Sequence, residues 1–207
     1  MGIVVLDYSL HFVVMKVYAF DFDGTLTKRD SFIEFLLFVK GWKDFVLCFL
    51  RYSPLLVLMK LHLYSNGKTK ERIFSHCFKD MPFDTFKTYC HRFAMENSSF
   101  LRPSGVLKVH EAKQEGSEVL IVSASVDNWV QPFFPGVKVL GTQVEVINGV
   151  LTGRFLTPNC YGMEKVRRIQ ALYPNRKDYE LVAFGDSYGD ACLLDYADEA
   201  YYKPFRK

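Results

Sequence analysis

The 207-residue sequence predicts an α/β protein in which one long helical insertion interrupts a parallel sheet. Three short apolar segments, 17–20, 118–122 and 180–184, have the length of buried strands, and each ends in turn-forming or polar residues. A helical pattern over 106–114 precedes the second segment, as expected when helices connect parallel strands. Between 30 and 97 no strand pattern occurs. The insertion is therefore expected to be all helical and to follow the first strand directly.

The first strand ends in a pair of acidic residues. The apolar run 17–20 is followed by Asp21, Asp23 and Gly24. Side chains at i and i+2 of a strand share a face, so both carboxylates can look toward one site at the carboxyl end of the strand. Two carboxylates this close repel each other unless a cation lies between them or one of them takes a proton. An ordinary Asp-Gly turn is the alternative for this pair alone.

The helical insertion begins with a predicted helix over 31–39. Ser31 followed three residues later by Glu34 is a capping-box pattern, which marks the start of a helix. Gly41 interrupts the apolar run, and Pro54 is expected to break the next one, because proline removes a backbone hydrogen bond from a helix. No segment reaches the roughly 18 to 20 uncharged residues of a membrane span. The apolar residues point either to helices packed on each other, or to an apolar substrate pocket or membrane-surface contact.

The rest of the insertion continues the helical pattern. Residues 65–67, Ser-Asn-Gly, are expected to form a turn. A helix is predicted over 69–79, and another from 83 to about 93. The whole of 30–97 is therefore predicted to be helical.

Beyond the insertion, strands and turns return. The second sheet strand is expected to end at residues 123–125, Ser-Ala-Ser, and these are expected to open the next helix. A helix N-terminus with small hydroxyl residues suits an anion, although such hydroxyls often serve only as helix caps. A further strand is predicted over 137–140. Asn-Gly at 148–149, between β-prone runs at 143–147 and 150–155, predicts a hairpin closed by a type I′ turn.

Composition narrows the possible functions. The formal net charge of +3 and the absence of a basic stripe with interleaved aromatics give no case for nucleic-acid binding. The five cysteines are odd in number and form no CxxC pair, which argues against a disulfide framework and favours the cytosol. Residues 1–14 lack the features of a signal peptide, and we interpret them as an incidental extension before Met15. An extra edge strand over 3–6 is the alternative. The oligomeric state is not predicted.

The strand ends and one helix, predicted over 162–172, carry the residues of a single expected site. These residues are Asp21, Asp23, Ser123, Lys165, Asp186 and Asp190. Oxygen ligands without histidine or cysteine suit Mg²⁺. A hydroxyl, backbone N–H groups and a lysine suit a phosphate. Together they indicate phosphoryl transfer with an aspartate nucleophile.

In these residues the sequence resembles the haloacid dehalogenase superfamily. Its four motifs occur in order: Asp21-Phe-Asp23-Gly-Thr25, Ser123 after an apolar strand, Lys165, and Gly185-Asp186-Ser-x-x-Asp190. The resemblance covers residues 16 to about 204. The sequence is also similar to subfamily IB, which includes phosphoserine phosphatases. The shared features are the helical insertion, the Ser-Ala-Ser motif, the hairpin and the final Lys203-Pro204. The resemblance implies a Rossmann-like core formed by 15–29 and 98–207, with a helical cap at 30–97.

The resemblance also implies a role for each motif residue. Asp21 would attack phosphorus, and Asp23 would act as general acid and then general base. Mg²⁺ would bind Asp21, Asp186, Asp190 and the main-chain carbonyl of Asp23. The phosphate-binding residues would be Thr25, Ser123, Ala124 and Lys165, and the substrate contacts Asp30, Arg72, Ser125 and Asn128.

The expected substrate is a small-molecule or lipid phosphomonoester. Asp30 and Arg72 match the positions that bind serine in phosphoserine phosphatases, but Asp30 is shortened from glutamate. The Ser-Ala-Ser motif also departs from their usual Ser-Gly-Gly. The apolar cap is similar to that of subfamily members that act on phosphorylated lipid headgroups, which implies a cytoplasmic enzyme with peripheral membrane contact. A non-catalytic phosphate- or lipid-binding module is the alternative outside enzymes, and the paired Asp21 and Asp23 argue against it.

Overall fold

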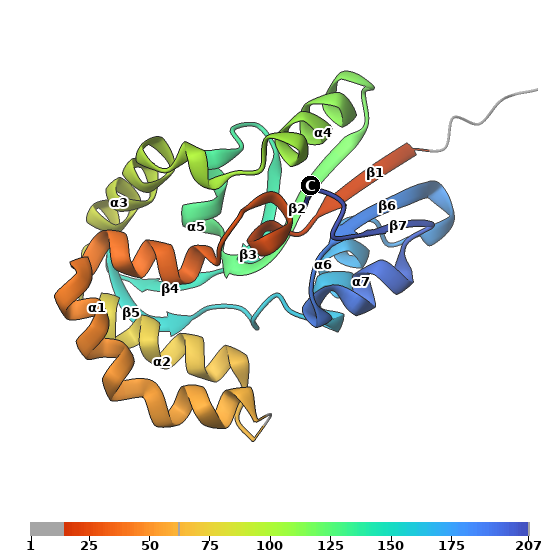
Figure 1. Ribbon diagram of the computed structural model, residues 1–207. Coiled ribbons are helices and arrows are strands. Elements are labelled where there is room, and N and C mark those ends of the chain that lie inside the picture. Colours follow the sequence, from red (N-terminus) through yellow and green to blue (C-terminus); the bar gives the residue numbers. More distant parts are fainter. Residues whose placement is uncertain (1–14, 62, 207) are drawn as a thin grey trace, which may run out of the picture.

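The computed structural model describes residues 15–61 and 63–206, and its centre is a five-stranded parallel sheet (Figure 1). The strand order is β3-β2-β1-β6-β7, and every neighbouring pair is parallel. The strands are β1 (Met15–Phe20), β2 (Glu118–Val126), β3 (Lys138–Thr142), β6 (Tyr179–Gly185) and β7 (Glu199–Tyr202). The predicted α/β fold class is confirmed. Residues 1–14, with the expected extension and its alternative strand, lie outside the described residues.

Helices cover both faces of the sheet, which explains why its central strand is almost entirely apolar. Phe20 of β1 packs in one cluster with Val109 of α4. Ala19, which points to the opposite face, packs in a second cluster with Ile169 of α6 and Leu193 of α7. The helices of this part are α4 (Pro103–Gln114), α5 (Asp127–Val130), α6 (Met163–Leu172) and α7 (Ala191–Tyr196). Short helical turns lie at Phe22–Leu26, Ser98–Phe100, Gln131–Phe133, Arg176–Asp178 and Tyr188–Asp190.

The segment after β1 forms a separate helical layer (Figure 1). It contains α1 (Ser31–Lys60), α2 (Asn66–Phe78) and α3 (Phe83–Glu96). The expected break at Gly41 is confirmed, because its φ of 73° and ψ of 168° kink α1 there. The hairpin β4 (Val144–Ile147) and β5 (Val150–Phe155) packs beside α2. The predicted type I′ turn is confirmed by positive φ at both Asn148 and Gly149.

Two expectations about α1 are wrong. The helix continues through Pro54, because the carbonyl of Leu50, left without its usual N–H donor, accepts a hydrogen bond of 2.8 Å from the hydroxyl of Ser53. The capping box at Ser31 is absent: Asp30 is the N-cap and accepts from the next turn, whereas Ser31 is the first helical residue. The carboxylate of Asp30 therefore supplies the cap that the pattern assigned to Ser31.

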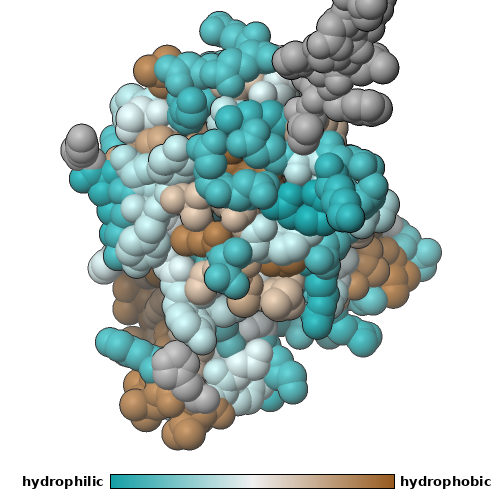
Figure 2. Space-filling view, turned by 90° about the vertical axis from the view of Figure 1, so that its right-hand side faces the viewer, coloured by the Kyte–Doolittle hydropathy of each residue, from teal (hydrophilic) through white to brown (hydrophobic). Residues whose placement is uncertain are grey.

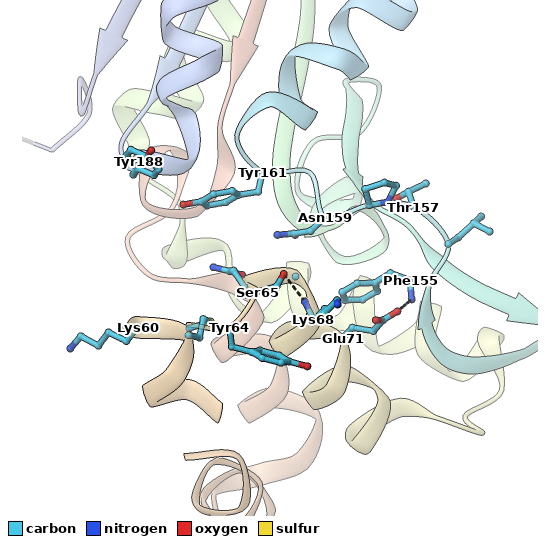
Figure 3. Close-up of a pocket in the computed structure, with 15 residues that line it drawn as sticks. Lys60, Tyr64, Ser65, Lys68, Glu71, Phe155, Thr157, Asn159, Tyr161 and Tyr188 are labelled. Atoms are coloured by element: carbon cyan, nitrogen blue, oxygen red, sulfur yellow. Dashed lines mark hydrogen bonds between the residues drawn. The ribbon is translucent and has the colours of Figure 1, made fainter. Parts of the chain in front are cut away.

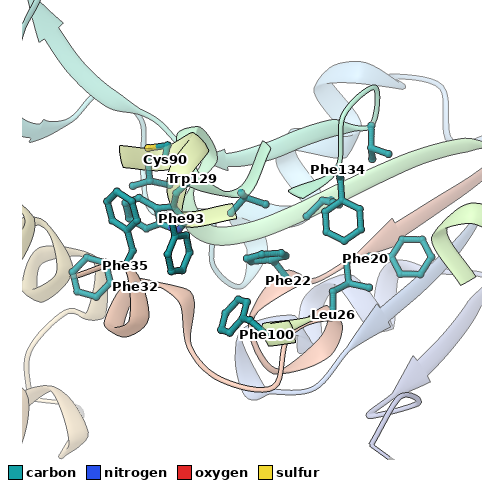
Figure 4. Close-up of a cluster of buried hydrophobic side chains, with 14 of the residues drawn as sticks. Phe20, Phe22, Leu26, Phe32, Phe35, Cys90, Phe93, Phe100, Trp129 and Phe134 are labelled. Carbon is teal, nitrogen blue, oxygen red and sulfur yellow. The ribbon is translucent and has the colours of Figure 1, made fainter. Parts of the chain in front are cut away.

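Aromatic rings join the cap to the sheet layer in one continuous cluster (Figure 4). Ring centroids lie 6.2 Å apart between Phe22 and Phe100, 6.1 Å between Phe100 and Phe93, and 5.3 Å between Phe93 and Phe35. Phe35 then stacks on Trp129 at 4.8 Å. Phenylalanines of the cap and of the sheet layer thus belong to one cluster.

Other expectations need small corrections. Residues 123–125 remain extended within β2 and do not open a helix, which begins only at Asp127. The turn expected at 65–67 is the start of α2, capped by the side chain of Ser65. The hydrophobic pattern of the sequence did not predict β7, because its residues are largely exposed at the sheet edge. Among the described residues, no helix combines the length and apolar character needed to cross a membrane.

Candidate active site

The candidate active site lies at the carboxyl ends of β1, β2 and β6. These three strands are neighbours, with Phe20 aligned with Ile121 on one side and with Phe184 on the other. Their ends therefore bring together residues that are far apart in the sequence. A cavity of about 530 Å³ opens here between the sheet and the cap. Its lining includes Asp21, Asp23, Ala124, Lys165, Asp186 and Asp190.

Lys165 is the buried cation at the centre of the site. Its Nζ donates hydrogen bonds to Asp21 Oδ1 at 2.6 Å, to Asp190 Oδ1 at 2.6 Å and to the carbonyl of Val122 at 2.7 Å. Burial by itself would lower the lysine pKa, but the carboxylates of Asp21 and Asp190 outweigh it and raise that pKa. The ammonium is therefore held charged, with all three donors engaged.

Asp21 is buried and held in a fixed orientation. Its Oδ2 accepts a hydrogen bond of 3.0 Å from the hydroxyl of Thr25, while its Oδ1 faces Lys165. Burial raises its pKa to about 7, although Lys165 opposes the shift. The carboxylate is thus a buried acceptor, and a bound cation would favour its ionised form.

Two further acids complete a group that fits a divalent cation. One carboxylate oxygen from each of Asp21, Asp186 and Asp190 lies within 4.8 Å of the others. Asp190 accepts from the backbone N–H groups of Asp186 and Ser187, and the Lys165 charge helps to hold its pKa below the usual range despite burial. Burial raises the pKa of Asp186, although Arg206 contacts its carboxylate. Lys165 pairs with Asp21 and Asp190, and Arg206 pairs with Asp186. The oxygen-only donor set of the three carboxylates suits Mg²⁺.

Gly24 shows why the first motif needs a glycine. Its φ is 80°, and a Cβ added there would lie 2.4 Å from Oδ2 of Asp186. Any side chain at this position would push the acidic group apart.

Asp23 lies in the same cavity but outside the three-acid group. Its Oδ1 accepts from the backbone N–H of Ser31 at 2.7 Å, and its Oδ2 accepts from the hydroxyl of Ser125 at 2.5 Å. Burial is the main cause that raises its pKa. A carboxyl group with a raised pKa beside a reaction site can carry a proton.

The other predicted phosphate residues occupy different depths. Ala124 lines the cavity. Ser123 is fully buried, and its hydroxyl oxygen accepts from the backbone N–H of Ser125 at 3.0 Å. Thr25 is likewise buried and turned toward Asp21.

Of the four expected substrate residues, two lie away from the acidic group. Arg72 is exposed on α2, where its guanidinium lies 5.4 Å from the centre of the Tyr64 ring, away from the acids. Asn128 lines a separate cavity, with Cys90 and His91. Asp30 lies at the rim of the site, but its Oδ1 caps α1. Ser125 contacts Asp23, as described above.

The residue that α2 does direct to the site is Lys70, which sequence reasoning missed. Asn66 and Lys70 line the cavity, and they are one helical turn apart. Arg72 lies two residues further, about 200° around a helix, and so points away. The helical period of α2, anchored on its buried residues, would have indicated Lys70.

A second cavity of about 910 Å³ continues from the first, between the end of the cap and the sheet layer (Figure 3). The two cavities share Asn66, Tyr161 and Tyr188. The second one extends to Met59 and Lys60 at the end of α1. The site therefore has room for a leaving group much larger than a phosphate.

The chain is similar in sequence to known proteins. Residues 18–195 match the family of haloacid dehalogenase-like hydrolases. Protein CicA of Caulobacter vibrioides is 34% identical over 196 residues, which cover 91% of this chain and 86% of that protein.

Solved structures share the fold. A protein of unknown function from Bordetella pertussis Tohama I superposes with a TM-score of 0.75 at 20% identity, covering 88% of this chain and 86% of that one. A substrate-bound phosphoserine phosphatase complex gives 0.61 at 20% identity, over 91% and 85%. The family match spans all four motifs and most of the sequence. The chain belongs to the haloacid dehalogenase-like hydrolases.

Proposed function

We propose that the protein is a Mg²⁺-dependent phosphatase that hydrolyses a phosphomonoester through a phosphoaspartate on Asp21. The observation that carries this proposal is the buried group of Asp21, Asp186, Asp190 and Lys165, with Asp23 held separately beside it. A module that only binds phosphate has no use for a nucleophile next to a second, proton-carrying carboxyl group.

The chain's own residues account for both half-reactions. A carboxylate oxygen of Asp21 attacks phosphorus, and the bond from phosphorus to the ester oxygen breaks. Asp23 gives its proton to that leaving oxygen, since an alkoxide leaves poorly without one. Water then attacks the phosphoaspartate, Asp23 takes a proton from it, and phosphate leaves. Lys165 stays protonated throughout and offsets negative charge beside Asp21.

The donor set described above fits Mg²⁺, which Asp21, Asp186 and Asp190 would hold together with the main-chain carbonyl of Asp23. When bound, the ion would neutralise charge on the phosphoryl oxygens.

Hydrolysis of p-nitrophenyl phosphate tests this proposal. We expect activity with Mg²⁺ and a loss of about 10²-fold or more after EDTA treatment, because the acids would then lack their counter-ion. Excess Mg²⁺ should restore the rate, which controls for damage by the chelator. If Mg²⁺-loaded protein hydrolyses neither this ester nor any member of a broad phosphomonoester panel, the phosphatase proposal is wrong.

A specific observation favours an amphiphilic substrate over phosphoserine. The large cavity reaches Lys60, which also lines an apolar groove on α1 together with Phe49, Leu50 and Val57. Leu50 and Val57 are 65% and 56% exposed. Figure 2 shows hydrophobic surface at the bottom of the molecule. Figure 1 draws the C-terminal end of α1 at the same height. An acyl chain could thus run from the phosphate site along the cavity to this groove.

Charge supports contact with an anionic lipid surface. Lys60 lines the apolar groove, and Lys68 and Arg72 follow on α2. Basic residues beside exposed apolar ones are typical of helices that lie on anionic membranes. The expected cap arginine for a serine carboxylate, Arg72, is directed elsewhere.

A pair of substrates with the same headgroup decides this point. We expect kcat/KM for lysophosphatidate to exceed that for glycerol 3-phosphate by at least about tenfold, because only the former buries an acyl chain. Val57→Glu should reduce this ratio. Leu107→Glu should not, because Leu107 is similarly exposed but lies on α4. Equal kcat/KM values, or phosphoserine as the preferred substrate by tenfold, would contradict the lipid assignment.

A further inference from the structure

A chain of hydrogen bonds runs from the aromatic cluster to Asp23. The indole Nε1 of Trp129 lies 3.2 Å from Oγ of Ser31, and this hydroxyl lies 2.9 Å from that of Ser125. The Ser125 hydroxyl lies 2.5 Å from Oδ2 of Asp23. Trp129, Ser31 and Ser125 are almost fully buried, so solvent does not compete for these bonds.

The donor at one end of this chain and the acceptor at the other set its direction. An indole N–H can only donate, so Ser31 Oγ accepts from Trp129. Ser31 then donates to Ser125, and Ser125 donates to the carboxylate of Asp23. The sequence of bonds is therefore ordered from a fixed donor to a fixed acceptor.

The far end of the chain is rigid. Trp129 is fully buried and stacks on Phe35 of α1 at 4.8 Å, with Phe86 of α3 edge-on at 6.5 Å. Figure 4 shows its ring beside those of Phe35 and Phe93. Rotation of the indole would disturb the packing of the cap on the sheet layer.

The near end holds both oxygens of one carboxyl group. Oδ1 of Asp23 is bound by the backbone N–H of Ser31, and Oδ2 by Ser125. Each carboxyl oxygen keeps a second lone pair, which can carry the transferred proton. Two contacts from different elements fix the plane of the carboxyl group, and with it the direction in which that proton points.

We propose that Ser31, Ser125 and Trp129 are positioning residues that orient the Asp23 carboxyl group for proton transfer to the leaving oxygen. The inference rests on the proposed phosphatase function. It assigns Ser125 the role of holding the general acid, Asp23, in place of the substrate contact expected from the sequence. None of the three residues needs to touch the substrate.

Two phosphate esters test this role, because their leaving groups differ in their need for a proton. The p-nitrophenolate of p-nitrophenyl phosphate leaves readily without protonation, whereas the benzyl alkoxide of benzyl phosphate does not. For Ser125→Ala we expect kcat/KM for benzyl phosphate to fall by about 10²-fold, and that for p-nitrophenyl phosphate by much less. The ratio kcat/KM reports the steps through departure of the alcohol, so later hydrolysis of the phosphoaspartate does not mask the difference.

Conservative variants separate positioning from packing. Ser125→Thr keeps a hydroxyl and should retain most of the benzyl phosphate activity. Trp129→Phe keeps a stacked ring but removes the N–H, and it should reproduce the selective loss at smaller size. Phe35→Leu alters the same packing without touching any of the hydrogen bonds, so it should lower Tm with no selectivity between the esters.

The possible results distinguish failure of the positioning role from failure of the phosphatase proposal. Equal losses on both esters in Ser125→Ala and Trp129→Phe, or no loss in either, would overturn the positioning role while wild-type activity leaves the phosphatase proposal intact. A wild-type protein inactive on both esters would instead overturn the phosphatase proposal, and this inference with it.

Discussion

Replacing Asp21 with asparagine should lower kcat for p-nitrophenyl phosphate by about 10³-fold or more, because the amide cannot act as the nucleophile and the catalytic residues act as a unit. The protein should remain folded. The amide oxygen can still accept from Lys165, and burial of the wild-type carboxyl group already raises its pKa to about 7. Steady-state assays with Mg²⁺, beside a thermal melt of each protein, measure both effects.

The stability of this variant has a definite pH dependence in chelator-treated buffer. The pKa of Asp21 is raised in the folded wild-type protein. The contribution of this carboxyl group to stability is therefore present below its unfolded-state pKa near 4 and is lost as pH rises toward 7. The Tm of Asp21→Asn relative to wild type should therefore increase over that window. Asp84→Asn changes an exposed carboxylate on α3 and serves as the control for both measurements. Substantial activity in Asp21→Asn would contradict the nucleophile assignment.

Replacing Lys165 with methionine should cost about 3–5 kcal/mol of unfolding free energy at pH 7, because it leaves the buried carboxylates of Asp21 and Asp190 without their shared cation. Phosphatase activity should fall with it. Urea unfolding of wild type and variant in chelator-treated buffer measures the difference. The cost should shrink when Mg²⁺ is added, since the ion supplies positive charge to the same acids.

Lys177→Met is the matched control, because Lys177 is an exposed lysine outside the site. It should change the unfolding free energy by no more than about 0.5 kcal/mol. A cost below about 1 kcal/mol for Lys165→Met would show that the two carboxylates do not depend on this ammonium.

The positions of the acids could be predicted because they depend on local features of the chain. Asp21 and Asp186 each follow a short apolar run, and parallel strands place their carboxyl ends at one edge. Gly24 could be recognised as part of a turn, yet its closeness to Asp186 appears only when β1 and β6 pair. Lys165 was expected at the site, but its three simultaneous bonds depend on α6 packing against the sheet.

The differences between expectation and structure share a physical cause, which is that neighbours in space changed the outcome of a local rule. Pro54 does not end α1, because Ser53 satisfies the carbonyl that proline leaves free. Arg72 was chosen by counting along the chain, while the rotation of α2 directs Lys70 to the site. Ser125 was expected to contact substrate, and the approach of Ser31 and Asp23 turns it inward.

The sequence by itself determined the fold class, the helical nature of the cap and the identity of the acidic motifs, because hydrophobic period and turn residues act over a few positions. Tertiary structure alone decided which cap residues face the acids, how the two cavities join, and what holds Asp23. Those features depend on how α1 and α2 pack against the sheet layer. Contacts between residues about a hundred positions apart, such as Ser31 with Ser125 and Trp129, leave no periodic signal in the chain.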